Sequence, residues 1–312
     1  GKSYNNNIRE NCKYLIYSKN EYIWKLPENT IIIFDEVHRC QNMNTYAGKL
    51  LLSLLDIYNK KIRLLLLSAT ISINSDKFYI FGLLLKWFTK YSIKPEWITN
   101  KKYNPIRATE LIEDKMFPNY ANRIQIKDLG SLFPKNQISA ECYNLESYNI
   151  INNEYNKLDK ILKTSPNNFG KIMIIRQKIE MQKIPIFIDL TNQYLDNNFS
   201  VIIFVNFTET LCNLSKKLGT KCLIYGEQTL KTREYNLSRF LNNDERIIIC
   251  NINAGRESIN LHDKYGIHPR ISLISPTWSC DKLIQAFGRS NRADSQSISI
   301  NKIIYCSNTI EE

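Results

Sequence analysis

Two adjacent carboxylates, Asp35 and Glu36, directly follow the apolar run Ile31–Phe34, and Val37 and His38 come next. A short apolar run that ends in polar side chains is typical of a buried strand in a parallel sheet. Ligands bind beyond the carboxyl ends of such strands, so an aspartate there can hold Mg²⁺ while the next glutamate orients or deprotonates a water molecule. The segment predicts a hydrolytic site with Asp35, Glu36 and His38 as catalytic candidates and Asp35 as the metal ligand. An acidic turn after a strand is the simpler alternative.

The next apolar run, Leu64–Leu67, is followed by the small residues Ser68-Ala69-Thr70, of which the serine and the threonine carry hydroxyls. Because the carboxyl ends of neighbouring parallel strands meet at one edge of a sheet, these hydroxyls can hydrogen-bond the carboxylates there. In that position they would report the state of a bound ligand to another part of the chain. The alternative is a serine or threonine cap that opens a turn.

Near the end of the sequence, Arg289 and Arg292 stand three residues apart, after Gln285 and Gly288. If the segment is helical, both guanidinium groups lie on one helical face. Planar guanidinium groups suit the charge that develops on a transferred phosphoryl group, so Gln285, Arg289 and Arg292 are further catalytic candidates. A solvated basic helix end is the alternative.

Strands and helices that alternate along the chain must position these residues. Ile31–Phe34 and Leu64–Leu67 predict two buried strands, and Tyr46–Tyr58 carries leucines at helical spacing between them, which makes one β-α-β unit. The second half repeats the pattern and predicts an α/β fold with parallel sheets. Its predicted strands are Val201–Val205, Cys222–Tyr225, Ile247–Asn251, Ile271–Ile274 and Ile303–Tyr305, and its predicted helices are Glu209–Leu218, Lys231–Leu241 and Cys280–Phe287.

Two segments lack this alternation. Residues from 97 to about 138 contain several prolines and no sustained period, so they predict a connection or an insertion. Residues 146–190 are polar and helix-prone, and predict a mostly solvated helical entry to the second half.

Composition narrows the class of protein. A chain of 312 residues with 43% hydrophobic content is long enough for two domains. Its 42 Lys and Arg against 30 Asp and Glu give a net charge of +12, which favours a polyanionic partner, with a basic solvated surface as the alternative. The eight cysteines lack zinc-site spacing, and every apolar run is too short for a bilayer, so we expect reduced thiols in an intracellular protein of the nucleus or cytoplasm. Candidate nucleic-acid contacts near the predicted connection are Lys101, Lys102 and Arg107.

The acidic segment, the Ser68-Ala69-Thr70 segment and the arginine segment resemble, in this order, motifs II, III and VI of superfamily 2 helicases. Asp35–Asn42 also resembles the D-E-x-H-R-x-x-N box of Swi/Snf-type translocases. Pro276–Asp281 is most similar to strawberry notch helicases and their viral relatives. Further similar segments are Val201–Leu211 (motif IV), Tyr225-Gly226 with Arg233 and Phe240, Ala254–Leu261 (motif V) and Thr309–Glu312, the T-I-E-E that follows motif VI.

The resemblance implies two tandem RecA-like lobes, with residues 1–96 as a partial first lobe, 97–140 as a helical or irregular connection and 141–312 as the second lobe. It implies an ATPase that couples hydrolysis of ATP, with Mg²⁺, to translocation on or unwinding of DNA. Asp35 and Glu36 would bind the nucleotide from one side of a cleft, and Arg289 and Arg292 from the other. The remaining implied roles are coupling for Ser68, Ala69 and Thr70, nucleotide binding for Lys2, Ser3, Gly255 and Gly288, and nucleic-acid binding for Thr208 and Asn260.

Three departures from the Swi/Snf pattern keep alternatives open. Ser68-Ala69-Thr70 replaces the usual T-G-T and is the version of true helicases, and Arg256 and Ser258 stand where motif V has glycine. No full phosphate loop, G-x-x-x-x-G-K-[ST], occurs, although Gly1-Lys2-Ser3 matches the end of one, so we expect that part of the nucleotide-binding front is missing. The alternatives are an RNA helicase and a catalytically inactive scaffold. The expected partner is nucleic acid, DNA rather than RNA, with subunits of a transcription or replication complex as further candidates.

Overall fold

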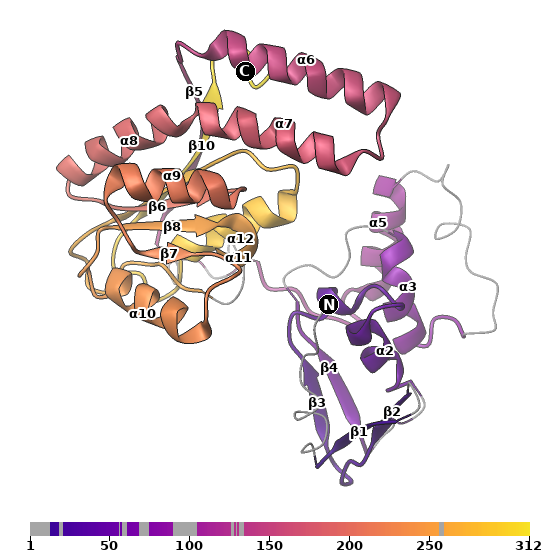
Figure 1. Ribbon diagram of the computed structural model, residues 1–312. Coiled ribbons are helices and arrows are strands. Elements are labelled where there is room, and N and C mark those ends of the chain that lie inside the picture. Colours follow the sequence, from indigo (N-terminus) through magenta and orange to yellow (C-terminus); the bar gives the residue numbers. More distant parts are fainter. Residues whose placement is uncertain are drawn as a thin grey trace. The chain divides into compact units, whose positions relative to one another are not determined.

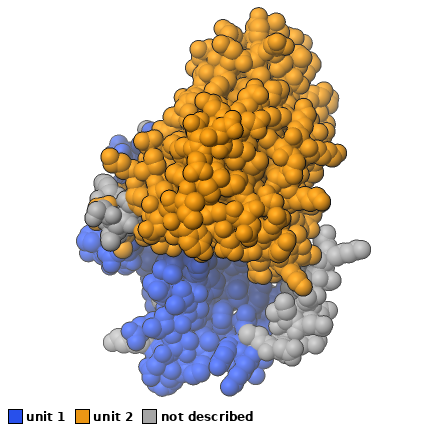
Figure 2. Space-filling model, turned by 90° about the vertical axis from the view of Figure 1, so that its left-hand side faces the viewer, with its two compact units in different colours: residues 1–123 blue, residues 124–312 orange. Residues whose placement is uncertain are grey.

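The computed structural model describes residues 13–18, 21–55, 57, 61–68, 75–89, 105–125, 128, 130, 134–255 and 259–312. The chain divides into two compact units, Gly1–Arg123 and Ile124–Glu312, which Figure 2 shows in different colours. No helix in these described ranges is long and apolar enough to cross a membrane.

The first unit contains two small sheets and a group of helices (Figure 1). Strands β1 and β2 pair antiparallel, whereas β3 and β4 pair parallel, with Ile31 opposite Arg63 and Phe34 opposite Leu66. The elements are β1 (Leu15–Ser18), β2 (Glu21–Trp24), β3 (Ile31–Phe34), the 3-10 helix η1 (Val37–Cys40), α2 (Tyr46–Leu52), β4 (Arg63–Leu66), α3 (Ser75–Leu84) and α5 (Pro105–Met116).

The parallel strands of the first unit bury one face. Every second residue of β3 and β4 packs against a core that also holds the helix residues Leu51 and Phe78. These strand residues are Ile32, Phe34, Leu64 and Leu66. The prediction of buried strands therefore holds for one face only, because among the described residues helices cover this two-stranded sheet on one side. The residues of the other face, which are 42 to 57% exposed, are Ile31, Ile33, Leu65 and Leu67.

Helix α2 is shorter than the predicted Tyr46–Tyr58. It begins where Thr45 accepts a hydrogen bond from the Gly48 N–H at 3.1 Å, a standard N-cap. It ends at Leu52 because the Ser53 hydroxyl turns back to the Leu50 carbonyl at 2.6 Å. Residues 53–55 and 57 are in turns rather than in a helix.

Residues 97–140, the predicted connection, contribute to both units. Helix α5 buries Ile112 and Met116 in the core of the first unit. The unit boundary falls after Arg123, and residues 136–140 belong to a strand of the second unit. The segment thus contains regular structure that its prolines and irregular period did not reveal.

The second unit is built on a six-stranded sheet with the order β5-β10-β9-β6-β8-β7, in which every pair is parallel. This confirms the predicted α/β fold with a parallel sheet. The strands are β5 (Asn136–Tyr143), β6 (Ser200–Val205), β7 (Leu223–Ile224), β8 (Ile247–Asn251), β9 (Arg270–Ile274) and β10 (Ser299–Cys306). The helices are α6 (Tyr148–Thr164), α7 (Phe169–Gln182), α8 (Ile184–Asp196), α9 (Thr208–Leu218), α10 (Leu230–Leu241), α11 (Ile252–Gly255) and α12 (Cys280–Ser290).

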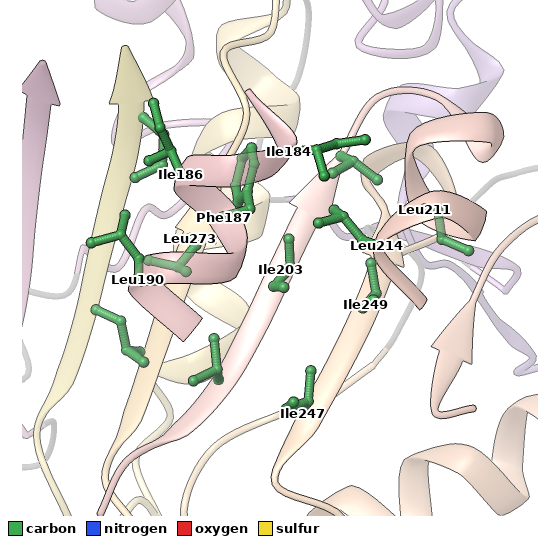
Figure 3. Packing of buried hydrophobic residues seen from close by; sticks show 14 residues of the cluster. Ile184, Ile186, Phe187, Leu190, Ile203, Leu211, Leu214, Ile247, Ile249 and Leu273 are labelled. Atoms are coloured by element: carbon green, nitrogen blue, oxygen red, sulfur yellow. The ribbon is translucent and has the colours of Figure 1, made fainter. Parts of the chain in front are cut away.

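Helices cover both faces of this sheet. Ile203 and its alternate neighbours in β6 pack with Phe187 of α8 and Leu214 of α9 on one face, as Figure 3 shows. Ile202 and Phe204 point to the other face, where Phe240 of α10 and Ala286 of α12 complete a second cluster. Burial on both faces explains why the central strands are continuous apolar runs.

The segment 146–190 forms α6, α7 and the start of α8, which confirms its helical prediction. The prediction that this segment is mostly solvated holds only for the outer faces of its helices. Ile151 and Leu158 of α6 face Ile172, Ile175 and Ile179 of α7 across a separate small core. The two helices therefore make a packed hairpin in the second unit, visible in Figure 1.

Candidate nucleotide site and nucleic-acid interface

The acidic segment begins where β3 ends. Asp35 is exposed, and its Oδ1 accepts the Glu36 N–H at 2.9 Å. Glu36 has a left-handed backbone, with φ 51° and ψ 43°, and it begins helix η1. Such a conformation is uncommon for a residue other than glycine and is found often at functional sites. It turns the chain sharply after the strand and so sets the direction of both carboxylates.

His38 brings the acidic segment and Ser68 together. Its Nδ1 lies 2.9 Å from Ser68 Oγ and 3.2 Å from Glu36 Oε2. Glu36 Oε2 is buried and gains a hydrogen bond from His38 only when Nδ1 carries the proton. In the other tautomer Nδ1 accepts from the serine hydroxyl. The Nδ1 atom of the histidine is therefore within reach of both the hydroxyl and the carboxylate, and its tautomer decides which of the two it bonds.

Backbone hydrogen bonds hold this arrangement. The Leu67 N–H donates to the Phe34 carbonyl at 2.8 Å, and the Val37 N–H donates to the Leu67 carbonyl at 3.0 Å. The parallel pairing of β3 and β4 thus continues past the strand ends and fixes Ser68 beside His38. Ala69 and Thr70, the other predicted coupling residues, lie outside the described residues.

The exposed Asp35 carboxylate fits a role as a Mg²⁺ ligand. Its Oδ1 accepts one backbone hydrogen bond, which orients the group and leaves acceptor capacity for a ligand. Mg²⁺ at nucleotide sites takes one or two carboxylates and completes its shell with phosphate oxygens and water. The described residues contain no group of three or more His, Cys, Asp or Glu side chains that could hold a metal ion.

Asn42, the last residue of the extended box, shapes the turn into α2. Its side chain accepts the Asn44 N–H at 3.0 Å, and its carbonyl accepts the Thr45 hydroxyl at 2.7 Å. A Cβ on Gly48 would stand 2.0 Å from the Asn42 carbonyl oxygen, so only glycine permits this approach. The asparagine therefore has a local structural role in the first unit.

Arg289, at the last turn of α12, is buried, with 7% of its surface exposed. Its Nη1 donates to the Ile259 carbonyl at 3.3 Å, and its own carbonyl accepts the Leu261 N–H at 2.8 Å. These bonds tie the end of α12 to the segment that resembles motif V. In this structure the guanidinium of Arg289 faces the protein interior.

Arg292 does not share a helical face with Arg289, because the helical segment on which that expectation depended ends before it. Helix α12 ends at Ser290, and Asn291 has an extended backbone with φ −114°. Arg292 lies in the following turn, where its N–H donates to Ser295 Oγ at 3.0 Å. Its half-buried guanidinium has a pKa lowered by burial, an effect that the nearby Asp294 opposes. Arg292 is thus the more accessible of the two arginines.

The other predicted nucleotide residues of this unit lie along the same elements. Gln285 is half-buried on α12, and Gly255 ends α11. An added Cβ at Gly288 would meet no described atom within 4 Å, so packing does not require glycine there. Lys2 and Ser3 lie outside the described residues.

A cavity lies at the carboxyl ends of three neighbouring strands, β6, β8 and β7. Thr208, a predicted nucleic-acid contact, is exposed on its wall as the first residue of α9. Arg233 of α10 also lines it and donates from Nη2 to the Tyr225 carbonyl at 3.1 Å, which fixes the guanidinium. The full lining is Thr208, Gly226, Glu227, Arg233, Asn251, Asn253 and Ala254.

The chemistry of this cavity suits a phosphate backbone. One guanidinium, three neutral polar side chains and a glycine can approach phosphate oxygens closely, although the carboxylate of Glu227 offsets part of the positive charge. Internal packing does not require a glycine at position 226, because a Cβ on Gly226 would meet no described atom within 4 Å. Open space beside a glycine at a cavity wall allows a ligand to approach the backbone.

The remaining predicted contacts are dispersed. Asn260, within the motif V segment, is exposed but does not line the cavity, and Arg107 is exposed on α5 of the first unit. Lys101 and Lys102 lie outside the described residues. The structure therefore brings Thr208 together with residues that the sequence reasoning did not assign, chiefly Arg233 and Asn251.

Part of the second unit is similar to a known protein family. Residues 182–294 match the family described as helicase conserved C-terminal domain. The matched segment includes the cavity at the ends of β6, β7 and β8, together with α12 and Arg292.

A relative covers nearly the whole chain. A putative ATP-dependent RNA helicase of Acanthamoeba polyphaga mimivirus is 36% identical over 340 residues, which span 98% of this chain and 63% of the relative. The chain thus covers just under two thirds of the length of this curated relative.

Solved structures that match the chain include the C-terminal part of the Fun30 ATPase domain, with a TM-score of 0.37, 20% identity and coverage of 55% of this chain and 65% of that chain. S. cerevisiae Dbp5 bound to RNA and ADP BeF3 has a TM-score of 0.44 and 17% identity, with coverage of 89% and 54%. Residues 182–294 are thus similar to the helicase conserved C-terminal domain, and the chain as a whole is similar to a protein named as a putative ATP-dependent RNA helicase.

Proposed function

We propose that this chain is the motor core of a nucleic-acid-dependent ATPase of helicase superfamily 2, which couples ATP hydrolysis to movement along nucleic acid or to strand separation. The observation that carries this proposal is the 36% identity to a protein named as an ATP-dependent RNA helicase, because the alignment spans 98% of this chain and so includes both units. The acidic segment in the first unit and the cavity in the second agree with that function.

In the first unit, Asp35 and Glu36 are assigned to nucleotide hydrolysis. ATP with Mg²⁺ supplies the phosphoryl group whose transfer to water drives the cycle. Asp35, exposed at the end of β3, would hold the metal, and Glu36 would orient and deprotonate the water. His38 would transmit a change at Glu36 to Ser68, because its Nδ1 lies within contact distance of both side chains.

In the second unit, Arg292 is assigned to the developing phosphoryl charge, with Arg289 as a second candidate. Arg292, which is less buried than Arg289, suits an arginine finger. Arg289 would need to leave its hydrogen bond with the Ile259 carbonyl to take part. The cavity walls, including Thr208 and Arg233, are assigned to the nucleic-acid backbone.

Two substrate classes are supported by different observations. Ser68-Ala69-Thr70 has the form found in true helicases, and the name of the relative favours RNA. Arg39 and Asn42 after the acidic box, and Thr309–Glu312, favour a duplex-DNA translocase of the Swi/Snf type. A helicase-fold scaffold without turnover is the candidate from a different class.

The test compares the ATPase rate of the complete protein with duplex DNA, single-stranded DNA and single-stranded RNA. Greatest stimulation by duplex DNA would favour the translocase, and stimulation by RNA alone would favour the RNA helicase. Hydrolysis that none of the three polymers stimulates would contradict the proposed function. Absence of any hydrolysis, with nucleic-acid binding intact, would favour the scaffold.

A further inference from the structure

A buried carboxylate at the carboxyl edge of the second sheet has no role in the proposed chemistry. Glu180, near the end of α7, is 3% exposed. Its Oε2 accepts the Asn206 N–H at 2.9 Å, the Asn206 Nδ2 at 2.6 Å and the Ser275 hydroxyl at 2.6 Å, and its Oε1 accepts the Phe207 N–H at 3.1 Å. Hydrogen bonds to a charged carboxylate are roughly twice as strong as neutral ones. Glu180 is therefore a strong acceptor for several donors at once.

These donors belong to two loops that leave neighbouring strands. Asn206 and Phe207 follow β6 and lead into α9, whose first residue is Thr208. Ser275 follows β9 and leads towards α12. Strand β6 pairs with β8 on one side and with β9 on the other. The chain leaves β6 towards one half of the sheet and later fills the other half, so Glu180 lies at the topological switch point.

Asn206 extends the contact to a third strand. Its Nδ2 also donates to the Pro276 carbonyl at 2.9 Å, which reinforces the link to the loop after β9. Its own carbonyl accepts the Asn251 Nδ2 at 3.1 Å, and Asn251 Oδ1 accepts the Asn253 N–H at 3.0 Å. Asn251 and Asn253 line the same cavity as Thr208. A continuous chain of hydrogen bonds therefore connects Glu180, through Asn206, to residues that line the cavity.

The charge of Glu180 suits its position. Helix α9 has no side-chain cap at Phe207, and a carboxylate at a helix N-terminus interacts favourably with the helix dipole. Asn206, Phe207 and Ser275 all donate to the carboxylate, so an amide in its place would direct its NH₂ group at another donor. A neutral glutamine would fill the same space but would lose some of the hydrogen bonds that the carboxylate accepts.

We propose that Glu180 is a positioning residue for nucleic-acid binding, whose carboxylate holds the loop that carries Thr208 and the loop after β9 in the geometry that a nucleic-acid strand requires. The proposal rests on the assignment of the cavity to nucleic acid under the proposed function. It extends that assignment to a residue outside the segment that matches the helicase C-terminal domain, which begins at residue 182.

The first test is hydrogen exchange on the complete protein, and it does not depend on activity. Glu180→Gln should raise the exchange rate at least about tenfold in peptides covering 204–210 and 273–280, since the charge-assisted acceptor is lost. Ser275→Ala removes one donor and should raise exchange in 273–280 only. Asp159→Asn, which removes an exposed carboxylate of α6 that pairs with Lys163 at 2.6 Å, is the control and should leave both peptides unchanged. Wild-type exchange in Glu180→Gln would overturn the proposal.

The second test separates positioning from general damage. Glu180→Gln should raise the nucleic-acid concentration for half-maximal ATPase stimulation about tenfold while the rate at saturating nucleic acid stays within about twofold of wild type. An equal rise of the half-maximal concentration in Glu180→Gln and Asp159→Asn, or an unchanged half-maximal concentration in Glu180→Gln, would contradict a positioning role. If the wild-type protein shows no stimulation at all, the proposed function fails, and the exchange experiment alone decides whether Glu180 holds the loops.

Discussion

Glu36 is the residue on which the proposed hydrolysis depends most directly. Its left-handed backbone fixes the carboxylate at the end of β3, and His38 lies 3.2 Å from its Oε2. A carboxylate can take a proton from water, whereas an amide of the same size cannot. The substitution Glu36→Gln should therefore lower the steady-state ATP hydrolysis rate of the complete protein at least about 100-fold, the usual contribution of a positioned base.

Nucleotide affinity separates this effect from unfolding. Glu36→Gln should keep the dissociation constant for ATP within about twofold, because the residue acts on water rather than on the phosphates. Glu28→Gln is the control in the same unit, since Glu28 is an exposed carboxylate paired with Lys61 at 2.5 Å. Wild-type hydrolysis in Glu36→Gln, or an equal loss in Glu28→Gln, would refute the assignment of the acidic segment.

Gly226 provides a residue-scale test of the cavity. A methyl group at this position would meet no described atom within 4 Å, so Gly226→Ala should leave the folded state intact. It should weaken nucleic-acid binding about tenfold, the equivalent of about 1.4 kcal/mol, by blocking approach to the backbone. Gly170→Ala is the matched control, because Gly170 has the same open surroundings but lies on α7 away from the cavity lining. Equal affinities for the two variants would show that nucleic acid does not approach Gly226.

At the scale of elements, the C-terminal T-I-E-E segment fastens the α6–α7 hairpin to the second sheet. The carboxylate of Glu311 accepts from Lys183, from the Tyr155 hydroxyl at 2.6 Å and from the Cys306 N–H at 2.9 Å. The Lys183 and Glu311 side chains are 2% and 4% exposed. Burial lowers the pKa of Lys183, and the charge of Glu311 opposes that shift. Removal of either partner would leave a buried charge without compensation.

The substitution Glu311→Gln should therefore lower the free energy of unfolding of the second unit by about 3–5 kcal/mol, the usual cost of breaking a buried ion pair. The neighbouring Glu312 is exposed and contacts only the Asn308 N–H among the described residues, at 2.8 Å, so Glu312→Gln should change the free energy by less than about 0.5 kcal/mol. Denaturant unfolding of the complete protein, followed by hydrogen exchange in β10 and α6, measures both. Similar values for the two variants would argue against the anchoring role of Glu311.

The apolar runs predicted the central strands well. β8 has the predicted bounds Ile247–Asn251, and β9 differs by one residue, because strands buried on both faces must be apolar throughout. No such apolar run marks β5, an edge strand with mixed polar residues. β10 begins earlier than predicted because its polar start is buried and paired: Asn301 donates to Asn136 Oδ1 at 2.7 Å.

Part of the candidate site was predictable from the position of polar residues relative to apolar strands. Polar residues directly after an apolar strand indicated Asp35 and Glu36, and the same rule applied to β6 and β8 would have indicated Asn206 and Asn251. The inward direction of Arg289 and the role of Glu180 depend on contacts between segments distant in sequence. Glu180 and Ser275 are separated by 95 residues, and no periodicity or motif records such a pairing.

At the scale of the whole molecule, the two units carry different parts of the proposed machinery. The first holds the acidic segment linked to Ser68, and the second holds Arg292 and the cavity with Thr208. The net charge of +12 favours binding to a polyanion without distinguishing DNA from RNA. The central claim is that hydrolysis in one part of the chain drives movement of nucleic acid bound at another.

Strand displacement by the complete protein tests that claim most directly. The assay would measure release of a labelled third strand from triplex DNA, and separation of a short RNA duplex with a single-stranded overhang, each with and without ATP. The proposed function predicts ATP-dependent release from at least one of these substrates by the wild-type protein, and at least about 100-fold slower release by Glu36→Gln. Release rates that are the same with and without ATP on both substrates, while ATP is being hydrolysed, would contradict it.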